Sequence, residues 1–452
     1  MMSKIQVVWF RDLSLWDFKS NGFNPSNELF KSKYPLVKIS EFLKRNKTQT
    51  IIKDEVLYIR VTISGKASFN GAMVRDKVYG KNIGIKKQYK IKEGQFLVSK
   101  IGAGDGAFGI ATNELNEAII TSDFWAFDCN QARINPYFLL FMVKTKKFIS
   151  FARASSSGTA LKRMNENKFL GAKIPLPPLE IQNKIVADIH AIQTKIKALQ
   201  VEEKRLKDEI ETYIYIALGL QKPQSVQKQK VFVVRFKNLE RWDTTYNQNK
   251  TINLYSSNTK FSKSKYPLVA LGEICTTNVG LTYEPKNISK TKQGVAVLRS
   301  NNIQNGKIDY NDLVYVDNTD IPNNKIANKG DLIICVRNGS ANLVGKTAMI
   351  EKNGMSFGAF MAIIRSKYNP YLYHFLQTDI FRNSVFEART SGINQISQSD
   401  IKKFKIPLPP LQIQKEMVEN IEQKTSYIQE IAKQRIVLHN SIESQLQKML
   451  ID

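Results

Sequence analysis

Apolar residues recur at alternating steps of four and three along two long segments of this chain. In the first segment these positions are Ile185, Ile189, Ile192, Ile196, Leu199, Leu206, Ile210, Tyr213 and Ala217, and only Glu203 breaks the row. The positions 232 residues further on are Met417, Ile421, Lys424, Ile428, Ile431, Arg435, Leu438, Ile442, Gln445 and Met449. This spacing predicts two coiled-coil helices. A helix of roughly 40 residues is about 60 Å long.

Neither helix can bury its apolar side alone, so we expect the two segments to pack against each other. Each segment follows its own globular region, which favours an antiparallel pairing that brings the two midpoints together. Glu203 and Arg435 break the apolar row at those midpoints. We therefore predict that these two side chains form an ion pair inside the seam.

Short runs of β-branched residues, separated by Gly and Asn, come before each long helix. They predict strands over Val56–Ile63, Phe96–Ile101, Val295–Ile303 and Asp331–Val336. Earlier strand-like segments that end in Trp-Asp cover Val7–Asp17 and Val231–Asp243. Aromatic-rich helices are predicted to begin at Asn135-Pro136-Tyr137 and at Asn369-Pro370-Tyr371, with Asn as the N-cap and Pro at the first helical position.

Two longer matches show that the chain is duplicated. Lys31–Val37 recurs as Lys263–Val269, and the Pro-rich stretch Ile174–Leu179 recurs as Ile406–Leu411, both 232 residues apart. One shared offset indicates duplication of a whole unit made of a domain and a helix. The prolines are expected to end the last strand of each domain and to aim it relative to its helix.

The predicted fold class is α+β. It consists of two small mixed α/β domains related by pseudo-twofold symmetry and joined by two long antiparallel coiled-coil helices. The expected parts are a first domain over residues 1–173, a central helix over 174–220, a linker over 221–230, a second domain over 231–405 and a C-terminal helix over 406–452.

Charge indicates the kind of partner. Lys and Arg number 67 against 40 Asp and Glu, which gives a formal net charge of +27. Arrays of Lys and Arg bind nucleic acid by displacing its condensed counterions. The alternatives are a basic protein kept in solution by its charge and one drawn to an anionic membrane. No basic amphipathic anchor accompanies the charge, and the longest apolar run, Phe138–Val143, is too short to span a bilayer.

Cysteine and histidine usage argues against a disulfide framework or a metal site. Cys129, Cys275 and Cys335 are isolated from one another, and only three histidines are present. The first residues, Met1–Arg11, lack a cationic leader followed by an apolar stretch. We expect a cytoplasmic protein without a bound metal.

Two motifs resemble catalytic signatures, and both have a structural explanation. Gly104–Gly109 matches the Gly-x-Gly-x-x-Gly pattern of a cofactor loop, but the chain after it continues as β-structure rather than opening a helix. We predict a turn between two strands. Asn135-Pro136-Tyr137 resembles the base-holding motif of amino-methyltransferases without its second proline, and a helix cap accounts for it. No catalytic residues are predicted.

The repeated domains, the Pro-Leu-Pro-Pro-Leu-x-x-Gln junctions at Ile174–Gln182 and Ile406–Gln414, and the heptads resemble the specificity subunits of type I restriction-modification systems. The Trp-Asp openings and the Gly-Asp-Leu-Ile turn at Gly330–Ile333 add to the resemblance. The first copy departs from it with Gly94-Gln95-Phe96 and with Ser157–Leu161, which lacks the Gln of Gly392–Ile396.

The resemblance implies a concrete division of labour. Each domain would be a target recognition domain that reads one half of a split, asymmetric site in double-stranded DNA. The helices would set the gap between the halves and dock two methyltransferase subunits. Base flipping and methyl transfer from S-adenosylmethionine would belong to those partners, and translocation and cleavage, with ATP and Mg, to restriction subunits.

Loops that carry Arg, Lys, Asn and Gln are the expected DNA contacts, because Arg reads guanine and Asn or Gln reads adenine in the major groove. The predicted residues are Lys100, Lys162, Arg163, Arg337, Lys346, Arg389, Asn394 and Gln395. For each of them, the alternative is a solvated surface charge or a turn-stabilising amide.

Three other functions remain open from the sequence. The chain could be the recognition subunit of another restriction type, whose partner carries fused methyltransferase and nuclease activities. A stand-alone methyltransferase is disfavoured by the missing motifs. A basic coiled-coil scaffold or RNA-binding protein would have no reason to duplicate and then diversify a globular domain.

Overall fold

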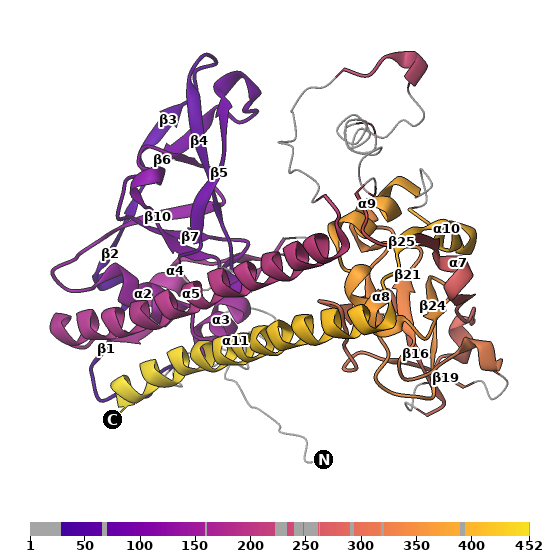
Figure 1. Cartoon of the computed structure of the whole chain (residues 1–452). Helices are drawn as coiled ribbons and strands as arrows, with labels where there is room; N and C mark the ends of the chain where they lie inside the picture. The colour runs from indigo at the N-terminus through magenta and orange to yellow at the C-terminus, as the bar shows by residue number, and fades with distance from the viewer. Residues whose placement is uncertain are drawn as a thin grey trace. The chain divides into compact units, whose positions relative to one another are not determined.

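The computed structural model describes most of the chain (Figure 1). The described residues are 29–65, 70–158, 161–221, 233–238, 247, 261, 263–289, 293–317, 321–388 and 394–451. The chain divides into two compact units, one made of Met1–Gln200 with Lys433–Asp452 and the other of Val201–Ala432. Each unit therefore contains one globular domain together with part of each long helix.

The first domain is built on a four-stranded antiparallel sheet that forms its core. The strand order is β2 (Leu43–Asn46), β10 (Phe124–Cys129), β7 (Phe96–Ser99) and β8 (Phe108–Ile110). Three helices accompany it, α2 (Pro136–Val143), α3 (Lys146–Ala154) and α4 (Glu166–Gly171). Phe96, Phe108 and Phe169 stack on one another in the fully buried interior. The predicted strand over Phe96–Ile101 is confirmed as β7.

A second sheet extends from this core. Its order is β3 (Gln49–Ile51), β6 (Lys87–Lys90), β9 (Ile119–Ile120), β4 (Leu57–Ile63) and β5 (Ala72–Tyr79). The predicted strand over Val56–Ile63 is confirmed as β4. We call β4 and β5 together the long ribbon; a β-bulge between Arg60 and Val61 interrupts its pairing, and such bulges increase local twist.

The second domain repeats both sheets. Its core sheet has the order β15 (Thr276–Val279), β24 (Met361–Arg365), β21 (Leu332–Cys335) and β22 (Thr347–Met349). Its second sheet has the order β19 (Val314–Val316), β16 (Val295–Leu298), β23 (Met355–Phe357) and β20 (Ile326–Ala327). The prediction over Asp331–Val336 is confirmed as β21, and the segment Val295–Ile303 gives β16 followed by a short 3-10 turn and β17 (Ile303–Gln304).

The two second sheets share a topology and differ in extent. β16 pairs in parallel with β23 and antiparallel with β19, as β4 does with β9 and β5. The strands β4 and β5 have 7 and 8 residues, however, whereas β16 and β19 have 4 and 3. The framework is therefore common to both domains, and the outer sheet is where they diverge.

The two repeated sequence matches lie against each other within each copy. β1 (Leu36–Lys38) pairs with β13 (Lys173–Pro175), and β14 (Leu268–Ala270) pairs with β25 (Lys405–Pro407), in the same antiparallel register. Each small sheet ties the start of a domain to its end. The chain then enters α5 (Leu179–Leu218) or α11 (Leu411–Ile451).

A buried glutamine fixes each junction. The Gln182 Nε2 donates to the carbonyl oxygens of Pro177 at 2.8 Å and Arg133 at 3.0 Å. In the second copy the Gln414 Nε2 donates to the carbonyl oxygen of Pro409 at 2.7 Å. Both amides bind the carbonyl of the first proline of the Pro-Pro pair, just before the helix begins.

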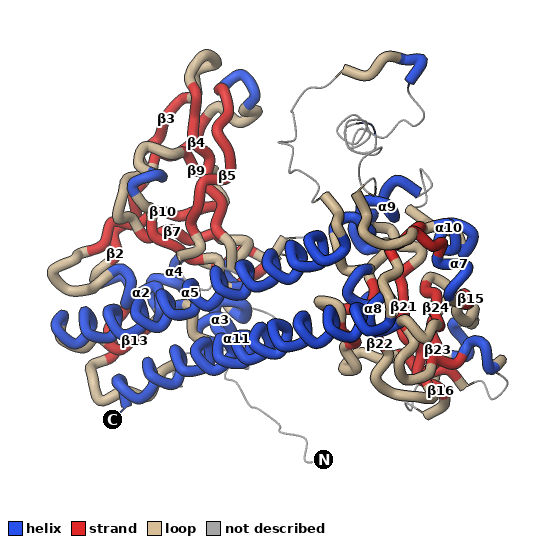
Figure 2. The backbone as a smooth tube through the Cα atoms, viewed as in Figure 1, coloured by secondary structure: helices blue, strands red, loops and turns tan. Residues whose placement is uncertain are grey.

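Within each unit, the parts of the two long helices pack antiparallel, as predicted (Figure 2). In the first unit, Ile185 and Ile189 near the start of α5 share a core with Leu446 and Leu450 near the end of α11. In the second unit the relationship is reversed, and the last turns of α5 share a core with the first turns of α11. Burial follows the heptad positions. Ile185, Ile189, Ile196, Leu206, Met417, Ile421 and Ile431 are buried, while Ile192, Leu199, Ile210, Ile428, Leu438 and Ile442 are half-buried.

Each helix ends on the domain of the other repeat. The Lys33 backbone N–H donates to the carbonyl of Leu450 at 3.0 Å, and the Lys265 N–H donates to that of Leu218 at 2.9 Å. The two donors are 232 residues apart in the sequence, and so are the two acceptors. The duplication therefore extends to the contact that closes each unit.

The Glu203 carboxylate pairs with Lys207 of its own helix at 2.6 Å. The predicted pairing of Glu203 with Arg435 across the seam stays a prediction. Val7–Asp17 lies outside the described residues. In the segment Val231–Asp243, the described residues 233–238 contain a 3-10 helix over Phe236–Asn238 in place of the predicted strand.

The two aromatic helices begin differently, which corrects one prediction. Asn135 caps α2 as predicted, because its side chain accepts from the backbone N–H groups of Tyr137 and Phe138. Asn369 instead lies inside the first turn of α8 (Asn369–Phe375), so the prediction that it caps this helix was wrong. Its buried amide donates to the carbonyls of Gly330, just before β21, and of Ile364 in β24.

Candidate nucleic-acid interface

The glycine-rich motif Gly104–Gly109 is a turn, as predicted. It connects the paired strands β7 and β8 through a 3-10 helix over Ala103–Asp105. Gly106 has a φ of 82°, and a Cβ there would lie 3.1 Å from the Ile149 side chain. The glycines therefore serve the tight turn, which glycine adopts without a steric penalty.

The three predicted DNA contacts of the first domain lie close together beside this turn. Lys100 follows β7, and its carbonyl accepts from the backbone N–H of Met164 at 3.0 Å. This bond places Lys100 next to the hairpin of β11 (Ser156–Ser157) and β12 (Arg163–Met164). Arg163 is exposed and its Nε donates to Asp123 at 2.9 Å, a contact that raises the pKa of Arg163. Lys162, one residue earlier, is also exposed.

Lys100 sits in a mixed aromatic and cationic environment. Its ammonium lies 5.5 Å from the centroid of the Trp125 ring. Burial lowers the pKa of Lys100, and the nearby Arg45 guanidinium lowers it further. Arg45 was not predicted from the sequence. Its guanidinium donates to the carbonyls of Ala126 and Phe124 on the neighbouring strand β10.

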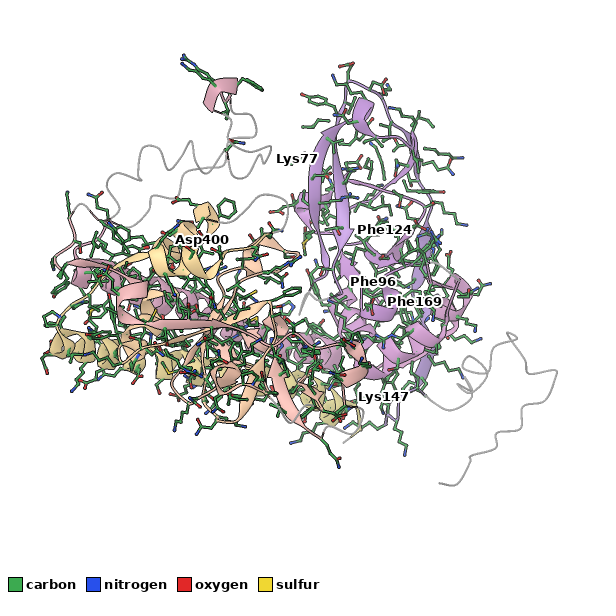
Figure 3. The ribbon with its side chains drawn as sticks, turned by 90° about the vertical axis from the view of Figure 1, so that its right-hand side faces the viewer. Lys77, Phe96, Phe124, Lys147, Phe169 and Asp400 are labelled. Atoms are coloured by element: carbon green, nitrogen blue, oxygen red, sulfur yellow. The ribbon has the colours of Figure 1, made fainter. Side chains whose placement is uncertain are left out.

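The long ribbon adds basic residues that the sequence analysis missed. Along β5 the residues alternate between exposed and half-buried, and the exposed positions carry Met73, Arg75, Lys77 and Tyr79. Lys77 projects from the ribbon, whereas Phe96 and Phe169 lie in the domain interior (Figure 3). The alternating pattern of exposed side chains was available in the sequence as a period of two. A two-stranded β-ribbon also fits the major groove.

The bulge organises the charges on this ribbon. Arg60 and Asp76 face each other across β4 and β5 and form two hydrogen bonds, at 2.7 and 2.6 Å. Their hydrogen bond raises the pKa of Arg60 and lowers that of Asp76. Arg75 is the additional residue of the bulge, because Asp76 faces Arg60 while Val74 faces Val61. The bulge therefore adds an exposed cation without leaving Asp76 unpaired.

In the second domain, three predicted residues converge on one loop. Arg337 follows β21 and forms an isolated antiparallel bridge with Gln395. Asn394 has a φ of 49°, and its Nδ2 donates to the carbonyl of Gly339 at 3.0 Å. The carbonyl of Asn394 accepts from the backbone N–H of Asn338 at 3.3 Å. The structure thus joins residues that are more than 50 positions apart in the sequence.

The other two predicted residues of this domain are placed differently. Lys346 is half-buried, and its ammonium donates to the carbonyl of Ile303 at 3.4 Å. Arg389 lies outside the described residues. Phe360, which the sequence analysis missed, lies beside the Arg337 loop with 54% of its surface exposed.

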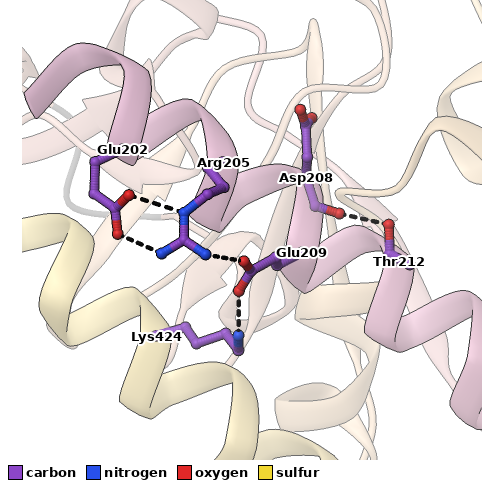
Figure 4. A network of polar contacts seen from close by, with 6 residues as sticks. All are labelled: Glu202, Arg205, Asp208, Glu209, Thr212 and Lys424. Carbon is purple, nitrogen blue, oxygen red and sulfur yellow. Dashed lines mark hydrogen bonds and ion pairs between the residues drawn. The ribbon is translucent and has the colours of Figure 1, made fainter. Parts of the chain in front are cut away.

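A separate surface lies on the long helices of the second unit. A groove of about 600 Å³ is lined by α5 residues from Val201 to Ile216 together with Lys424. Val201 and Ile216 are 63% and 66% exposed. Beside them, Arg205 pairs with Glu202 and Glu209, and Glu209 in turn pairs with Lys424 of α11 (Figure 4). The surface is apolar with charged edges, a composition suited to a partner protein.

In the described part of the chain, no cluster of three or more His, Cys, Asp or Glu side chains could hold a metal ion. Among those same residues, no helix combines the length and the hydrophobicity needed to cross a lipid bilayer.

Comparisons with known proteins indicate a family. The type I restriction modification DNA specificity domain matches residues 23–212 and 263–438. The EcoKI specificity subunit of Escherichia coli is 30% identical over 162 residues, and the StySPI specificity subunit of Salmonella potsdam is 31% identical over 150 residues. The matches cover 34% and 32% of this chain and only about a third of those subunits, 35% and 32% respectively.

Longer matches cover both copies at lower identity. The MjaVIII specificity subunit of Methanocaldococcus jannaschii is 21% identical over 412 residues, which cover 86% of this chain and 85% of that subunit. A solved structure that describes complex assembly and conformational transition of the type I R-M system shares the fold, with a TM-score of 0.53 and 16% identity over 93% of this chain and 97% of that one. With its two domain matches, its duplicated framework and its paired helices, the chain belongs to the type I restriction-modification DNA specificity family.

Proposed function

We propose that this chain is a specificity subunit that reads a bipartite, asymmetric site in double-stranded DNA and performs no bond chemistry itself. The observation that carries the proposal is the repetition of one framework around two unlike outer surfaces. The core sheets and the β1–β13 and β14–β25 junctions are the same in both copies. The long ribbon and the loop after β21 that carries Arg337 differ between the copies.

This division is what a split-site reader requires. A common framework presents each reading surface in the same way, while different side chains recognise different bases. The net charge of +27 supplies affinity for the phosphate backbone that does not depend on sequence. Long helices of defined length would then set the separation between the half-sites.

We assign the helix groove to a methyltransferase subunit and propose that two such subunits bind this chain. The exposed Val201 and Ile216 provide an apolar contact, and the Arg205 network provides charged groups at its edge. S-adenosylmethionine would be bound by these partners, and ATP and Mg by restriction subunits. The complex would act on host DNA in the cytoplasm.

The test is selection of DNA by the complex of this chain with its methyltransferase subunits. Duplexes are retained from a random pool at physiological salt and sequenced. Two short, unlike motifs at one constant spacing are expected. A single continuous motif, two identical halves, or preference for RNA over duplex DNA would contradict the proposal.

A further inference from the structure

We propose that Arg337 reads a guanine in the half-site bound by the second domain, and that Phe360 positions the guanidinium for that contact. This proposal deepens the proposed function and rests on it. It assigns one residue to base recognition and another, which no sequence pattern indicated, to orienting it.

The geometry of the pair is the starting point. The Arg337 guanidinium carbon lies 4.9 Å from the centroid of the Phe360 ring, and both side chains are exposed. A guanidinium that stacks on an aromatic face keeps the N–H groups at its edge available for hydrogen bonds. The stack therefore holds the plane of Arg337 without using the donors that bind a base.

The backbone fixes this arrangement from both sides. The carbonyl of Phe360 accepts from the N–H groups of Val336 at 2.9 Å and of Arg337 at 3.3 Å. Ile396, on the opposite side, donates its N–H to the carbonyl of Val336 at 2.9 Å. Arg337 thus leaves a backbone held by two neighbouring segments, which reduces the conformational freedom lost on binding DNA.

Other arginines of this domain are already engaged within the protein. Arg365 pairs with Asp331 at 2.9 Å, and Arg382 donates to the carbonyls of Val344 and Asn342. Among the described residues, the Arg337 guanidinium stacks on the Phe360 ring and forms no hydrogen bond or ion pair with a carboxylate or carbonyl. Its hydrogen-bonding edge is therefore suited to an external acceptor.

The neighbours of Arg337 favour a base edge over a lone phosphate. Gln395 opposes Arg337 in the antiparallel bridge, and opposed residues direct their side chains to the same face. An Arg guanidinium on that face matches the O6 and N7 acceptors of guanine with two hydrogen bonds. Asn394 has a different role, because its amide already holds Gly339 and thereby shapes the loop.

The experiment uses the complex of the full chain with its methyltransferase subunits, and the half-sites obtained by DNA selection. Each guanine of the second half-site is replaced in turn by 7-deazaguanine, which removes the N7 acceptor, or by inosine, which keeps both N7 and O6. For the native complex, we expect 7-deazaguanine at one position to weaken binding about ten-fold or more, while inosine there has little effect.

The variants assign that position to Arg337. The Arg337→Gln complex should bind the native and the 7-deazaguanine duplexes equally at that position, while it still discriminates at the first half-site. Phe360→Leu should reduce the discrimination and Phe360→Tyr should preserve it, since only the second variant keeps a ring. Lys352→Gln is the matched control, because Lys352 stacks on Tyr310 at 4.4 Å elsewhere in the same domain.

Three outcomes would overturn the inference. In the first, the Arg337→Gln complex still discriminates against 7-deazaguanine at every guanine. In the second, Phe360→Leu has the same effect as Lys352→Gln. In the third, the second half-site contains no guanine. If the native complex selected no split site at all, the proposed function itself would fail, which is a distinguishable result.

Discussion

Gln95 and Asp331 occupy corresponding turns in the two domains, each after a glycine with positive φ. Both side chains accept from the backbone N–H three residues earlier at 2.8 Å. Gln95 then donates to Asp128, whereas Asp331 accepts from Arg365. The two copies therefore differ in the charge of the partner side chain, which is acidic for Gln95 and basic for Asp331, while the turn is the same.

A buried histidine makes the second domain sensitive to acid. Burial lowers the pKa of His374 from its ordinary 6.5 to about 4. The unfolded chain binds a proton more readily than the folded one between these two values, so stability falls as the pH falls from 6.5 towards 4. The full loss corresponds to roughly 3 kcal/mol.

The comparison of native chain with His374→Phe isolates this contribution. Chemical unfolding at pH 7.5 and pH 5 should show a larger loss of stability on acidification for the native chain than for His374→Phe. Equal losses in the two proteins would mean that His374 titrates alike in the folded and unfolded states.

The sequence predicted several interface residues but not how they combine. Arg337, Asn394 and Gln395 were named separately because their side chains suit base recognition, and a tertiary bridge brings them together. No sequence pattern indicated Phe360 or Arg45, because the residues that each of them contacts lie on segments distant in the chain. Asn before Pro usually caps a helix, whereas the buried Asn369 amide donates to the carbonyls of Gly330 and Ile364.

At the scale of elements, the two junctions differ in how firmly they are held. Gln182 is fully buried, donates to two carbonyls and accepts from the N–H of Asn135 at 2.8 Å. Gln414 is also buried and donates to the carbonyl of Pro409. The first junction thus connects the helix to a wider part of its domain.

Replacing these glutamines should therefore have unequal effects. Gln182→Ala leaves more buried partners unsatisfied and should destabilise the chain by about 1–3 kcal/mol, more than Gln414→Ala. Urea unfolding of the full chain measures both values. An equal or greater loss for Gln414→Ala would show that the additional bonds of Gln182 contribute nothing.

The long ribbon makes a second prediction at this scale. If β4 and β5 lie along DNA, Lys77→Gln should reduce the slope of log affinity against log salt by about 0.9, the value for one phosphate contact. Lys147→Gln is the matched control, since Lys147 is an exposed lysine on α3 (Figure 3). Salt titrations of the complex would contradict the ribbon contact if both variants kept the native slope or changed it equally.

Periodicity predicted the elements whose pattern is long and regular. The α5 and α11 helices, their antiparallel packing and the strands β4, β7 and β21 were all expected from the sequence. The length of the ribbon relative to its counterpart was not, because two short β-branched runs give no indication of how far their pairing extends. The segment Val231–Asp243 predicted a strand from its β-branched residues, and the structure has a 3-10 helix at Phe236–Asn238.

At the scale of the whole molecule, the duplication governs how the chain is closed. Lys33 binds the end of α11 as Lys265 binds the end of α5, so each repeat is completed by the helix of the other. The exact sequence matches mark these closing contacts and the junction strands. Outside these positions the two copies differ in sequence, as two readers of different half-sites would be expected to.

The central claim is that one framework carries two unlike readers of DNA, and methylation of the host genome tests it most directly. N6-methyladenine is mapped by single-molecule sequencing in cells with and without the gene for this chain. The account predicts that its loss removes one motif, made of two different half-sites separated by a constant number of unspecified bases. An unchanged methylation pattern in cells that express active methyltransferase subunits, or the loss of a continuous or symmetric motif, would contradict it.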